Sequence, residues 1–599
     1  VEGRRIMKKN RINVFLIKEG IALECILNDL EDSGAEFVSL SDEYENYFFG
    51  VRPQNIHIPE WVSSFFEDSL SPKSVGEVAS VGAVLIVPVQ VMKNAERQSV
   101  KVIANVAADE EDWEMTRYFA LTFGYGRSLL NPSMIEERFG LKCVLNTVRD
   151  NSLRMIQSVD VSGSSRRLNE QLPREGRIEA FDLDIERNLL NKVTAKSETN
   201  SLLPGMITGG DSLTVAVNVS IKNLASFLRD IYMLYQRDDY KEHFDWVDNI
   251  AAVKDPDLKD KLWNTAIQEI RSYDDEEDDV WHRLWMTVPE VLNWDGIDGF
   301  QIGQQQDSQG RPLLHKDIVL RDVVQSFRRQ PLTSLSQLQN KKIYAVKLDG
   351  DDYFAPYGWS ADRCLVGDVT FDDRTYCISD GKWYEIEADY LKRINTDFEN
   401  TAPSSVPFIP YLNMYDKDEY FVPEGIEGKE ISVKGEGRYN FEIQHQLNKE
   451  ETDHYLLMDR KNIGYGGGRS QEEFCDVLTD CGQRIHVKRC SGSAAMSHLF
   501  NQGLVSASLE KDADEFVRLV DDKIMQIAKG RNVSLDQFLL TENKIREVIF
   551  AVVPERRYDH PDLPFFSKVA FASVKKQLKR MGIETYFNWI PREKAESDE

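Results

Sequence analysis

The spacing of hydrophobic residues predicts strands and helices that alternate along most of the chain. Apolar and β-branched runs near the amino terminus, such as Ile12–Ile17 and Val84–Val89, have the length and composition of strands. A helical pattern is expected around Glu111–Thr122, and an amphipathic helix over Leu224–Tyr235. This mixture predicts a multidomain α/β protein.

Changes in composition along the 599 residues predict a series of modules, which suits a chain of this length. Residues 1–6, before Met7, carry no export signal and are expected to be a remnant of expression. The expected modules are an N-terminal α/β domain over 7–150, a helix-rich α/β domain over 151–300, a linker rich in Gln, Ser and Arg over 301–340, a small strand-rich module over 341–400, and a C-terminal α/β domain over 430–599.

The order of elements becomes informative in the last of these modules. The pattern there predicts a helix from Tyr439, three strands, a second helix, and then strand, helix and strand. Glu472–Thr479 and Arg484–Cys490, the second and third strands, are joined by a short turn that contains Gly482. We therefore expect these two strands to pair antiparallel. The helix after them, Ser493–Leu509, carries a glycine in its middle.

This order resembles the core of restriction-endonuclease-like nucleases, the PD-(D/E)xK fold. Those enzymes carry an Asp on the second core strand and an acid-x-Lys motif on the third, and the matching positions here are Asp476, His486 and Lys488. The resemblance implies that these residues are catalytic and that Glu442, on the first helix, assists them. Asp476 and Glu442 would hold Mg²⁺ or Mn²⁺, which polarises the scissile phosphate and activates a water. Lys488 would orient that water and stabilise negative charge.

His486 departs from the pattern, since the family has an acid at this position. Mg²⁺ prefers oxygen ligands, so His486 would have to ligate Mn²⁺ or act as a base. Strand geometry places it on the same face as Lys488. The alternative interpretation is structural, with Asp476 and Lys488 forming an ion pair across neighbouring strands.

The cysteines indicate a reducing environment. There are seven, an odd number, with irregular spacing and no Cys-x-x-Cys pair, which predicts free thiols and a cytoplasmic protein. Cys475, Cys481, His486 and Cys490 lack the spacing of zinc ligands, so we expect buried apolar cysteines instead. The longest apolar run, Val81–Val89, is too short to cross a bilayer.

The net charge of −27 opposes non-specific binding to polyanions. Contact with nucleic acid therefore requires a local basic surface or a partner. The predicted helix Ser567–Arg580 offers such a surface through Lys575, Lys579 and Arg580. Its alternative interpretation is a solvated helix face.

Six segments are specific only in combination: Phe123–Leu130, Phe139–Val148, Gly381–Glu385, Phe474–Leu478, Ile485–Arg489 and Ser497–Ala507. Together they resemble a bacterial family described as sporadically distributed proteins of unknown function. Its members tend to occur near restriction and phage-defence genes, which implies a defence role by association. Two functions follow as hypotheses: a metal-dependent nuclease of antiviral defence that cleaves DNA or RNA, or a non-catalytic sensor or scaffold subunit that binds nucleic acid, a protein partner or a second copy.

Overall fold

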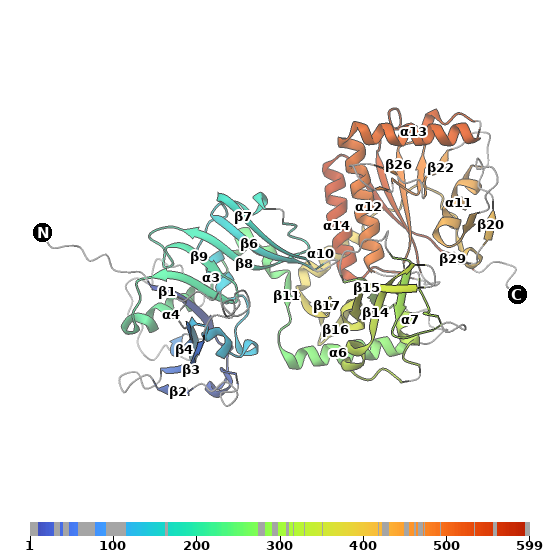
Figure 1. Ribbon diagram of the computed structural model, residues 1–599. Helices are drawn as coiled ribbons and strands as arrows, with labels where there is room; N and C mark the ends of the chain where they lie inside the picture. Colours follow the sequence, from blue (N-terminus) through green and yellow to red (C-terminus); the bar gives the residue numbers. More distant parts are fainter. Residues whose placement is uncertain are drawn as a thin grey trace, which may run out of the picture. The chain divides into compact units, whose positions relative to one another are not determined.

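The chain forms two compact units in a computed structural model, and each unit is described by itself (Figure 1). One unit comprises residues 1–159 and 167–247, and the other comprises 160–166 and 248–599. The residues described are 10–28, 36–39, 47–57, 78–91, 115–161, 166–181, 183–273, 282–289, 297–306, 311–315, 317–328, 330–349, 352–416, 419–421, 431–448, 454–459, 463–464, 471–472, 474–490, 493–531, 533–554 and 560–593. The mixture of helices and several sheets confirms a multidomain α/β protein.

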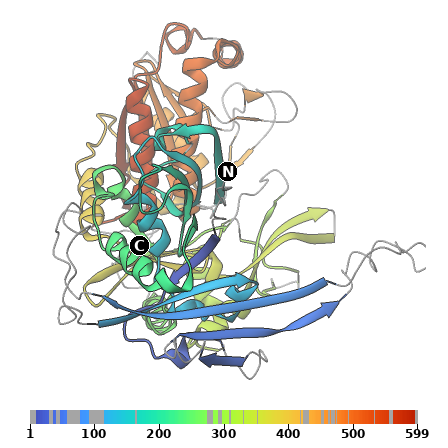
Figure 2. The same cartoon turned by 90° about the vertical axis from the view of Figure 1, so that its left-hand side faces the viewer.

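The first unit is built on a ten-stranded sheet with the order β2-β3-β4-β5-β1-β10-β9-β8-β6-β7. Strands β3, β4 and β5 run antiparallel beside one another (Figure 2). The strands are β1 Asn10–Leu16, β2 Glu36–Ser39, β3 Phe48–His57, β4 Val78–Val91, β5 Met115–Gly124, β6 Leu153–Asp160, β7 Arg166–Gly176, β8 Asn188–Ser197, β9 Gly205–Gly209 and β10 Ser212–Val217; the helices are α3 Phe139–Leu145, α4 Ile221–Tyr235 and α5 Lys241–Phe244.

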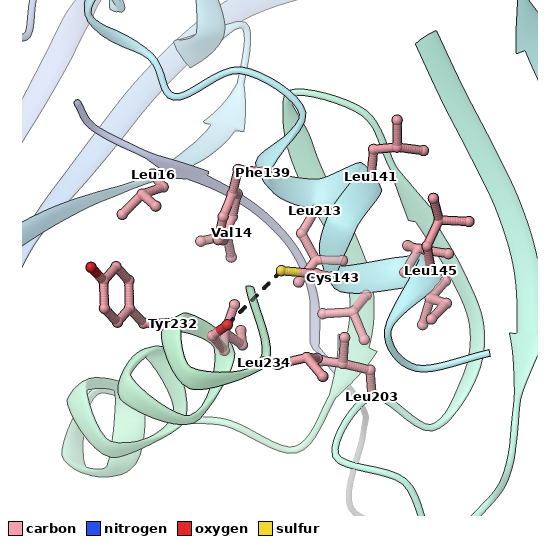
Figure 3. Packing of buried hydrophobic residues seen from close by; sticks show 14 of the residues in the cluster. Val14, Leu16, Phe139, Leu141, Cys143, Leu145, Leu203, Leu213, Tyr232 and Leu234 are labelled. Carbon is pink, nitrogen blue, oxygen red and sulfur yellow. Dashed lines mark hydrogen bonds between the residues drawn. The ribbon is translucent and has the colours of Figure 1, made fainter. Parts of the chain in front are cut away.

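Helices α3 and α4 bury their apolar sides in the largest hydrophobic core of this unit (Figure 3). The thiol of Cys143 on α3 points toward α4 and lies 3.9 Å from the carbonyl oxygen of Ile231. The helix predicted over Leu224–Tyr235 is confirmed and begins three residues earlier, where Ser220 and Asn223 form a capping box.

The segment Glu111–Thr122 was expected to be helical, and this expectation is wrong for its described part. Strand β5 begins at Met115 and pairs with β4 on one side and β1 on the other. Because both of its edges gain hydrogen-bond partners in the sheet, tertiary pairing outweighs the local helical pattern.

The middle part of the second unit contains a five-stranded sheet of order β11-β18-β17-β16-β12 and a three-stranded sheet of order β13-β14-β15. Helices α7 and α8 fall within 301–340, the stretch expected to be a linker, but Leu320, Val323 and Leu338 are buried in a core. The elements are β11 Ile250–Ala252, α6 Pro256–Ser272, β12 Leu284–Met286, β13 Gly299–Ile302, α7 Leu320–Gln325, α8 Leu335–Asn340, β14 Lys342–Asp349, β15 Asp352–Ser360, α9 Ala361–Cys364, β16 Leu365–Phe371, β17 Arg374–Ser379, β18 Lys382–Ile386 and α10 Ala388–Glu399.

The last part of the chain forms a five-stranded sheet of order β22-β25-β26-β27-β28. Strand β25 is antiparallel to both of its neighbours, whereas β26, β27 and β28 are parallel. The elements are β19 Tyr411–Leu412, β20 Glu419–Phe421, β21 Ile431–Val433, α11 Glu436–Leu447, β22 Tyr455–Leu457, β23 Ile463–Gly464, β24 Gln471–Glu472, β25 Val477–Thr479, β26 Gln483–Arg489, α12 Ser493–Asp512, α13 Asp514–Arg531, β27 Glu547–Val553, α14 Phe565–Arg580, β28 Glu584–Trp589 and β29 Arg592–Glu593.

The predicted antiparallel pairing of the second and third strands is confirmed. Val477 lies opposite Ile485, and Leu478 lies opposite Arg484. Strand β25 is much shorter than predicted, so it covers only the first part of β26 on this edge.

The two faces of this sheet are covered by different helices (Figure 1). Alternate residues of β27 point to opposite faces: Ile549 packs with Ile443 of α11, whereas Phe550 packs with Phe500 of α12 and Phe571 of α14. Helices α12 and α14 therefore lie side by side on one face, and α11 lies on the other.

All seven cysteines are free thiols, as the sequence predicted. Five are buried, while Cys25 and Cys481 are exposed. Burial raises the pKa of Cys143, Cys364 and Cys377, which keeps these three thiols protonated and unreactive. None of the helices in the described parts of the chain has both the length and the apolar character needed to span a bilayer.

Gly503 lets α12 approach the sheet closely, which leads to a stability prediction. A Cβ atom at this position would lie 2.6 Å from Cε1 of Phe550. Alanine normally stabilises a helix by about 0.5–1 kcal/mol over glycine. We expect Gly503→Ala instead to lower the free energy of unfolding by about 1–3 kcal/mol, because the Phe550 ring has no room to move in a packed core. Calorimetric melting checks this, with Asn501→Ala, on the exposed face of α12, as the control. An unchanged melting temperature for Gly503→Ala would contradict the packing.

Candidate functional site

The C-terminal end of β26 meets the first turn of α11. Nζ of Lys488 lies 3.1 Å from Oε2 of Glu436, and the backbone N–H of Arg489 donates to Oε1 of the same carboxylate at 2.9 Å. Gly435 precedes the helix with φ 63° and ψ −129°, a backbone conformation that L side chains rarely adopt. The glycine thus allows α11 to begin at the strand end, with an acid in its first turn where the helix dipole favours one.

Asp476 directly precedes β25 and lies beside the C-terminal part of β26. Its Oδ2 accepts the backbone N–H of Val487 at 2.7 Å, and its Oδ1 accepts Nδ2 of Asn440 at 3.2 Å. Asn440 follows Glu436 by one helical turn, so α11 presents both side chains on one face. The carboxylate of Asp476 is therefore held between β26 and α11.

Asp476 and Glu436 continue the hydrogen bonding of the β26 edge beyond the end of β25. The N–H groups of Val487 and Arg489 point to the same edge, since they are two residues apart in a strand. Each donates to a carboxylate in place of a strand carbonyl. Two residues along a strand separate the two donors by roughly 6.6 Å. The two acids are therefore fixed as neighbours by the backbone of one strand.

Lys488 stays positively charged in this environment. The Glu436 carboxylate raises the pKa of Lys488 above its ordinary value, burial acts in the opposite direction, and the charges of Asp476 and Asp317 raise it further. A lysine that keeps its proton cannot serve as a general base, but it can neutralise and hold an anionic oxygen. The charge of Asp476 thus acts on Lys488, and Glu436, which the sequence did not single out, contacts Lys488 directly.

His486 is placed in the core rather than beside the carboxylates. Burial, together with the positive charge of Arg484, lowers its pKa to about 3. Its ring centroid lies 6.0 Å from that of Phe550, and within the described parts of the chain its Nε2 has no hydrogen-bond partner. His486 is therefore neutral at physiological pH and covered by the α12 side of the sheet, and this geometry supports neither a base nor a metal ligand.

Glu442 is also turned away from Lys488. Its Oε1 pairs with Arg438 at 2.6 Å and its Oε2 accepts Nε2 of Gln446 at 3.0 Å. Two helical residues from Asn440 amount to about 200° of rotation, which places Glu442 on another side of α11. The sequence selected the right helix but missed Glu436, because the predicted helix began at Tyr439. The signal for a helix that begins before Tyr439 was Gly435, followed directly by an acid.

Two arginines converge on a carboxylate next to this pair. Asp416 accepts the guanidinium groups of Arg489, at 3.0 Å, and Arg592, and also the hydroxyl of Tyr411 at 2.6 Å. Tyr411 and Arg592 belong to β19 and β29, which pair in parallel. The chain's last described strand is thereby tied to the end of β26.

Lys579 and Arg580, in the last turn of α14, lie at the opposite end of the sheet from Lys488, and Lys575 is engaged by other residues. Nζ of Lys575 is bound by Oδ1 of Asp397 and Oγ1 of Thr401, both at 2.9 Å, so this lysine ties α14 to the end of α10. Lys579 and Arg580 are exposed in the last turn of α14. That turn precedes β28, whose first residues are level with the start of β26. The structure therefore does not bring these three residues together with Lys488.

The donor set can be compared with the divalent cation that the nuclease resemblance implies. In the described ranges, no group of three or more His, Cys, Asp and Glu side chains is arranged to hold a metal. This finding also applies to the cysteines around β25 and β26. Closed zinc sites need four ligands. Mg²⁺, in contrast, is usually held by one or two carboxylates and takes its other ligands from water and substrate phosphates. Asp476 and Glu436 fit this second kind of site.

The neutral state of buried His486 predicts a pH-dependent stability. Its folded-state pKa is depressed from 6.5 to about 3, so between these values the unfolded chain binds a proton that the folded chain does not. Stability from this residue is complete above pH 6.5 and falls as the pH drops. We expect the wild type to lose about 2 kcal/mol more than His486→Gln between pH 7 and pH 5. Denaturant unfolding at both pH values measures this difference. Equal losses for the two proteins would contradict a buried, neutral histidine.

Comparison with known proteins gives a family but no activity. A family model described as "Family of unknown function (DUF6119)" matches residues 12–591. No curated protein matches the chain, and no solved structure matches it either. Because the model covers nearly the whole sequence, the chain belongs to the DUF6119 family of unknown function.

Proposed function

We propose that this protein acts in bacterial antiviral defence and that its C-terminal region is a metal-dependent nuclease that cleaves DNA or RNA. The observation that carries the proposal is the environment of Lys488. Its ammonium group pairs with Glu436 at 3.1 Å and lies within the electrostatic influence of Asp476, at the C-terminal end of β26. Two acids and a permanently charged lysine are the groups that phosphodiester cleavage uses in the nucleases that the sequence resembles.

The topology supports the same proposal. Helix α11, the strands β22, β25 and β26, helix α12, strand β27, helix α14 and strand β28 follow one another in the order from which the resemblance was inferred. Asp476 lies directly before the second strand of this series and Lys488 on the third. The defence role rests on the gene neighbourhood of the family that the sequence resembles, which is an association and weaker support than a site.

The residues of the chain have separable parts in the proposed reaction. Lys488 holds a phosphate oxygen and neutralises the negative charge that grows on the phosphorus centre in the transition state. Asp476 and Glu436 cannot turn freely, because each accepts a backbone N–H of β26 through one oxygen. Their other oxygens accept from Asn440 and Lys488, so a cation would use the further lone pairs of these fixed carboxylates. Bound to these oxygens, a divalent cation would polarise the phosphate and lower the pKa of a water.

A second candidate is a non-catalytic sensor or scaffold subunit that binds nucleic acid or a protein partner. The observation that favours it is His486, which takes the place of the acid on the third strand and is buried and neutral. Under this alternative Lys488, Glu436 and Asp476 hold the strand end together without reacting. The two candidates differ in what a substitution at Lys488 does.

We expect Lys488→Ala to reduce cleavage by on the order of 10²-fold or more while the protein stays folded, because the charge acts mainly in the transition state. Asp476→Asn should reduce cleavage similarly and also weaken Mn²⁺ binding measured by calorimetry. Lys576→Ala, which removes an exposed lysine on α14, is the control and should keep full activity. The assay combines labelled single- and double-stranded DNA and RNA with Mg²⁺ or Mn²⁺, and melting temperature is recorded for each variant.

Full cleavage by a folded Lys488→Ala protein would exclude this site as the nuclease centre. Binding of an oligonucleotide by the wild type, without cleavage in either metal, would favour the sensor or scaffold. A lower melting temperature of Lys488→Ala with no cleavage by the wild type would point to a structural ion pair.

A further inference from the structure

The convergence of Arg489 and Arg592 on Asp416 is not needed for the chemistry proposed at Lys488. Asp416 gives one oxygen to Arg489 at 3.0 Å and the other to Arg592, and Tyr411 donates its hydroxyl to Asp416 at 2.6 Å. Two guanidinium groups facing a single planar anion are the arrangement that also suits a phosphate, because each guanidinium presents several N–H donors in one plane.

Both arginines are held in position before any ligand arrives. Nε of Arg592 donates to Oδ1 of Asn413 at 2.7 Å. Cζ of the same guanidinium lies over the Tyr411 ring, 5.1 Å from its centroid. The backbone of Arg489 is fixed by the Glu436 carboxylate. Fixed guanidinium groups lose little conformational entropy on binding an anion.

The cluster reaches solvent at Arg489 and Asp416, whereas the side chain of Arg592 is 11% exposed. The side chains of Arg489 and Asp416 are 34% and 30% exposed. Nε of Arg489 is buried and has no hydrogen-bond partner within the described residues. A buried donor without a partner is unfavourable, so a ligand or water that accepts from it is stabilised.

The position of Arg489 indicates which anion would bind. Its guanidinium lies beside the start of α11, with Nη1 3.6 Å from the Cβ position of Gly435, and the next residue, Glu436, binds Nζ of Lys488. A chain of phosphates that places one phosphate at Lys488 therefore brings the next one toward Arg489. Single anions such as free phosphate would gain from only one of these two positions.

We propose that Arg489 and Arg592 form a phosphate-binding position for the nucleic-acid backbone, next to the phosphodiester held at Lys488. Asp416 occupies the two guanidinium groups when no nucleic acid is bound, and it competes with the backbone phosphate for them. This inference rests on the proposed function for the identity of the ligand. It concerns binding alone, so it is tested without cleavage.

The experiment measures binding of fluorescein-labelled single-stranded DNA, double-stranded DNA and single-stranded RNA by anisotropy, in EDTA, over a series of salt concentrations. We expect Arg489→Ala to weaken binding about tenfold and to reduce the slope of log K against log salt by about 1, since one phosphate contact is lost. Arg489→Lys keeps the charge and should retain the slope with weaker binding. Arg374→Ala is the matched control, because it removes an arginine from an exposed pair with Glu385 and should change neither quantity.

Asp416→Asn distinguishes a binding position from a purely structural cluster. The amide oxygen still accepts from Tyr411, but the competing charge is gone, so binding should become several-fold tighter. Unchanged affinity and slope in Arg489→Ala and Asp416→Asn, or no binding of any of the three probes by the wild type, would overturn the inference. Wild-type binding that depends on Arg489, without cleavage when Mg²⁺ or Mn²⁺ is added, would uphold the inference and refute the nuclease proposal. The three probes separate DNA from RNA.

Discussion

The edge of β26 beyond the end of β25 sets the constraint on which the candidate site depends. Strand β25 spans three residues and β26 seven, so the N–H groups of Val487 and Arg489 lose their strand partner. Backbone donors at a mostly buried position must find another acceptor. The carboxylates of Asp476 and Glu436 provide it. A shortened strand thereby converts a hydrogen-bonding requirement into two fixed negative charges beside Lys488.

The same constraint explains why stability and function are difficult to separate here. Removing either carboxylate leaves a backbone N–H without its acceptor and Lys488 with less compensating charge. This arrangement explains the roles of two nearby residues. Asn440 donates to Oδ1 of Asp476, the oxygen that does not bind β26, and Gly435 lets α11 start close enough for Glu436 to reach the strand. Substitutions that keep the hydrogen bond and remove the charge, such as Asn and Gln, are therefore the informative ones.

Much of the C-terminal fold could be predicted from the sequence, because its strands have strong local patterns and a short turn. The pairing of Val477 with Ile485 follows directly from this turn. The role of Glu436 could not be predicted, since it depends on a glycine conformation that starts the helix three residues before its apolar pattern. The alternation of side chains along a strand predicted that His486 shares a face with Lys488, but only the packing shows that Phe550 and its neighbours cover His486.

Elsewhere the local patterns were misleading for related reasons. The helical pattern before Thr122 gave way to strand pairing on both edges of β5. Leu320 and Leu338, in a stretch whose composition is typical of a linker, are buried by elements distant in sequence. The basic residue Lys575 of α14 is engaged by Asp397 and Thr401, which no sequence pattern reveals.

We propose that Asp476 and Glu436 form one centre with Lys488 that takes a metal and a phosphodiester. The most direct test is a crystal structure of the Lys488→Ala protein with Mn²⁺ and an oligonucleotide whose phosphates resist cleavage. We expect an anomalous manganese peak bound by Asp476 or Glu436, with a phosphate oxygen on the same ion. An oligonucleotide bound elsewhere on the protein, with no manganese at these two carboxylates, would contradict it.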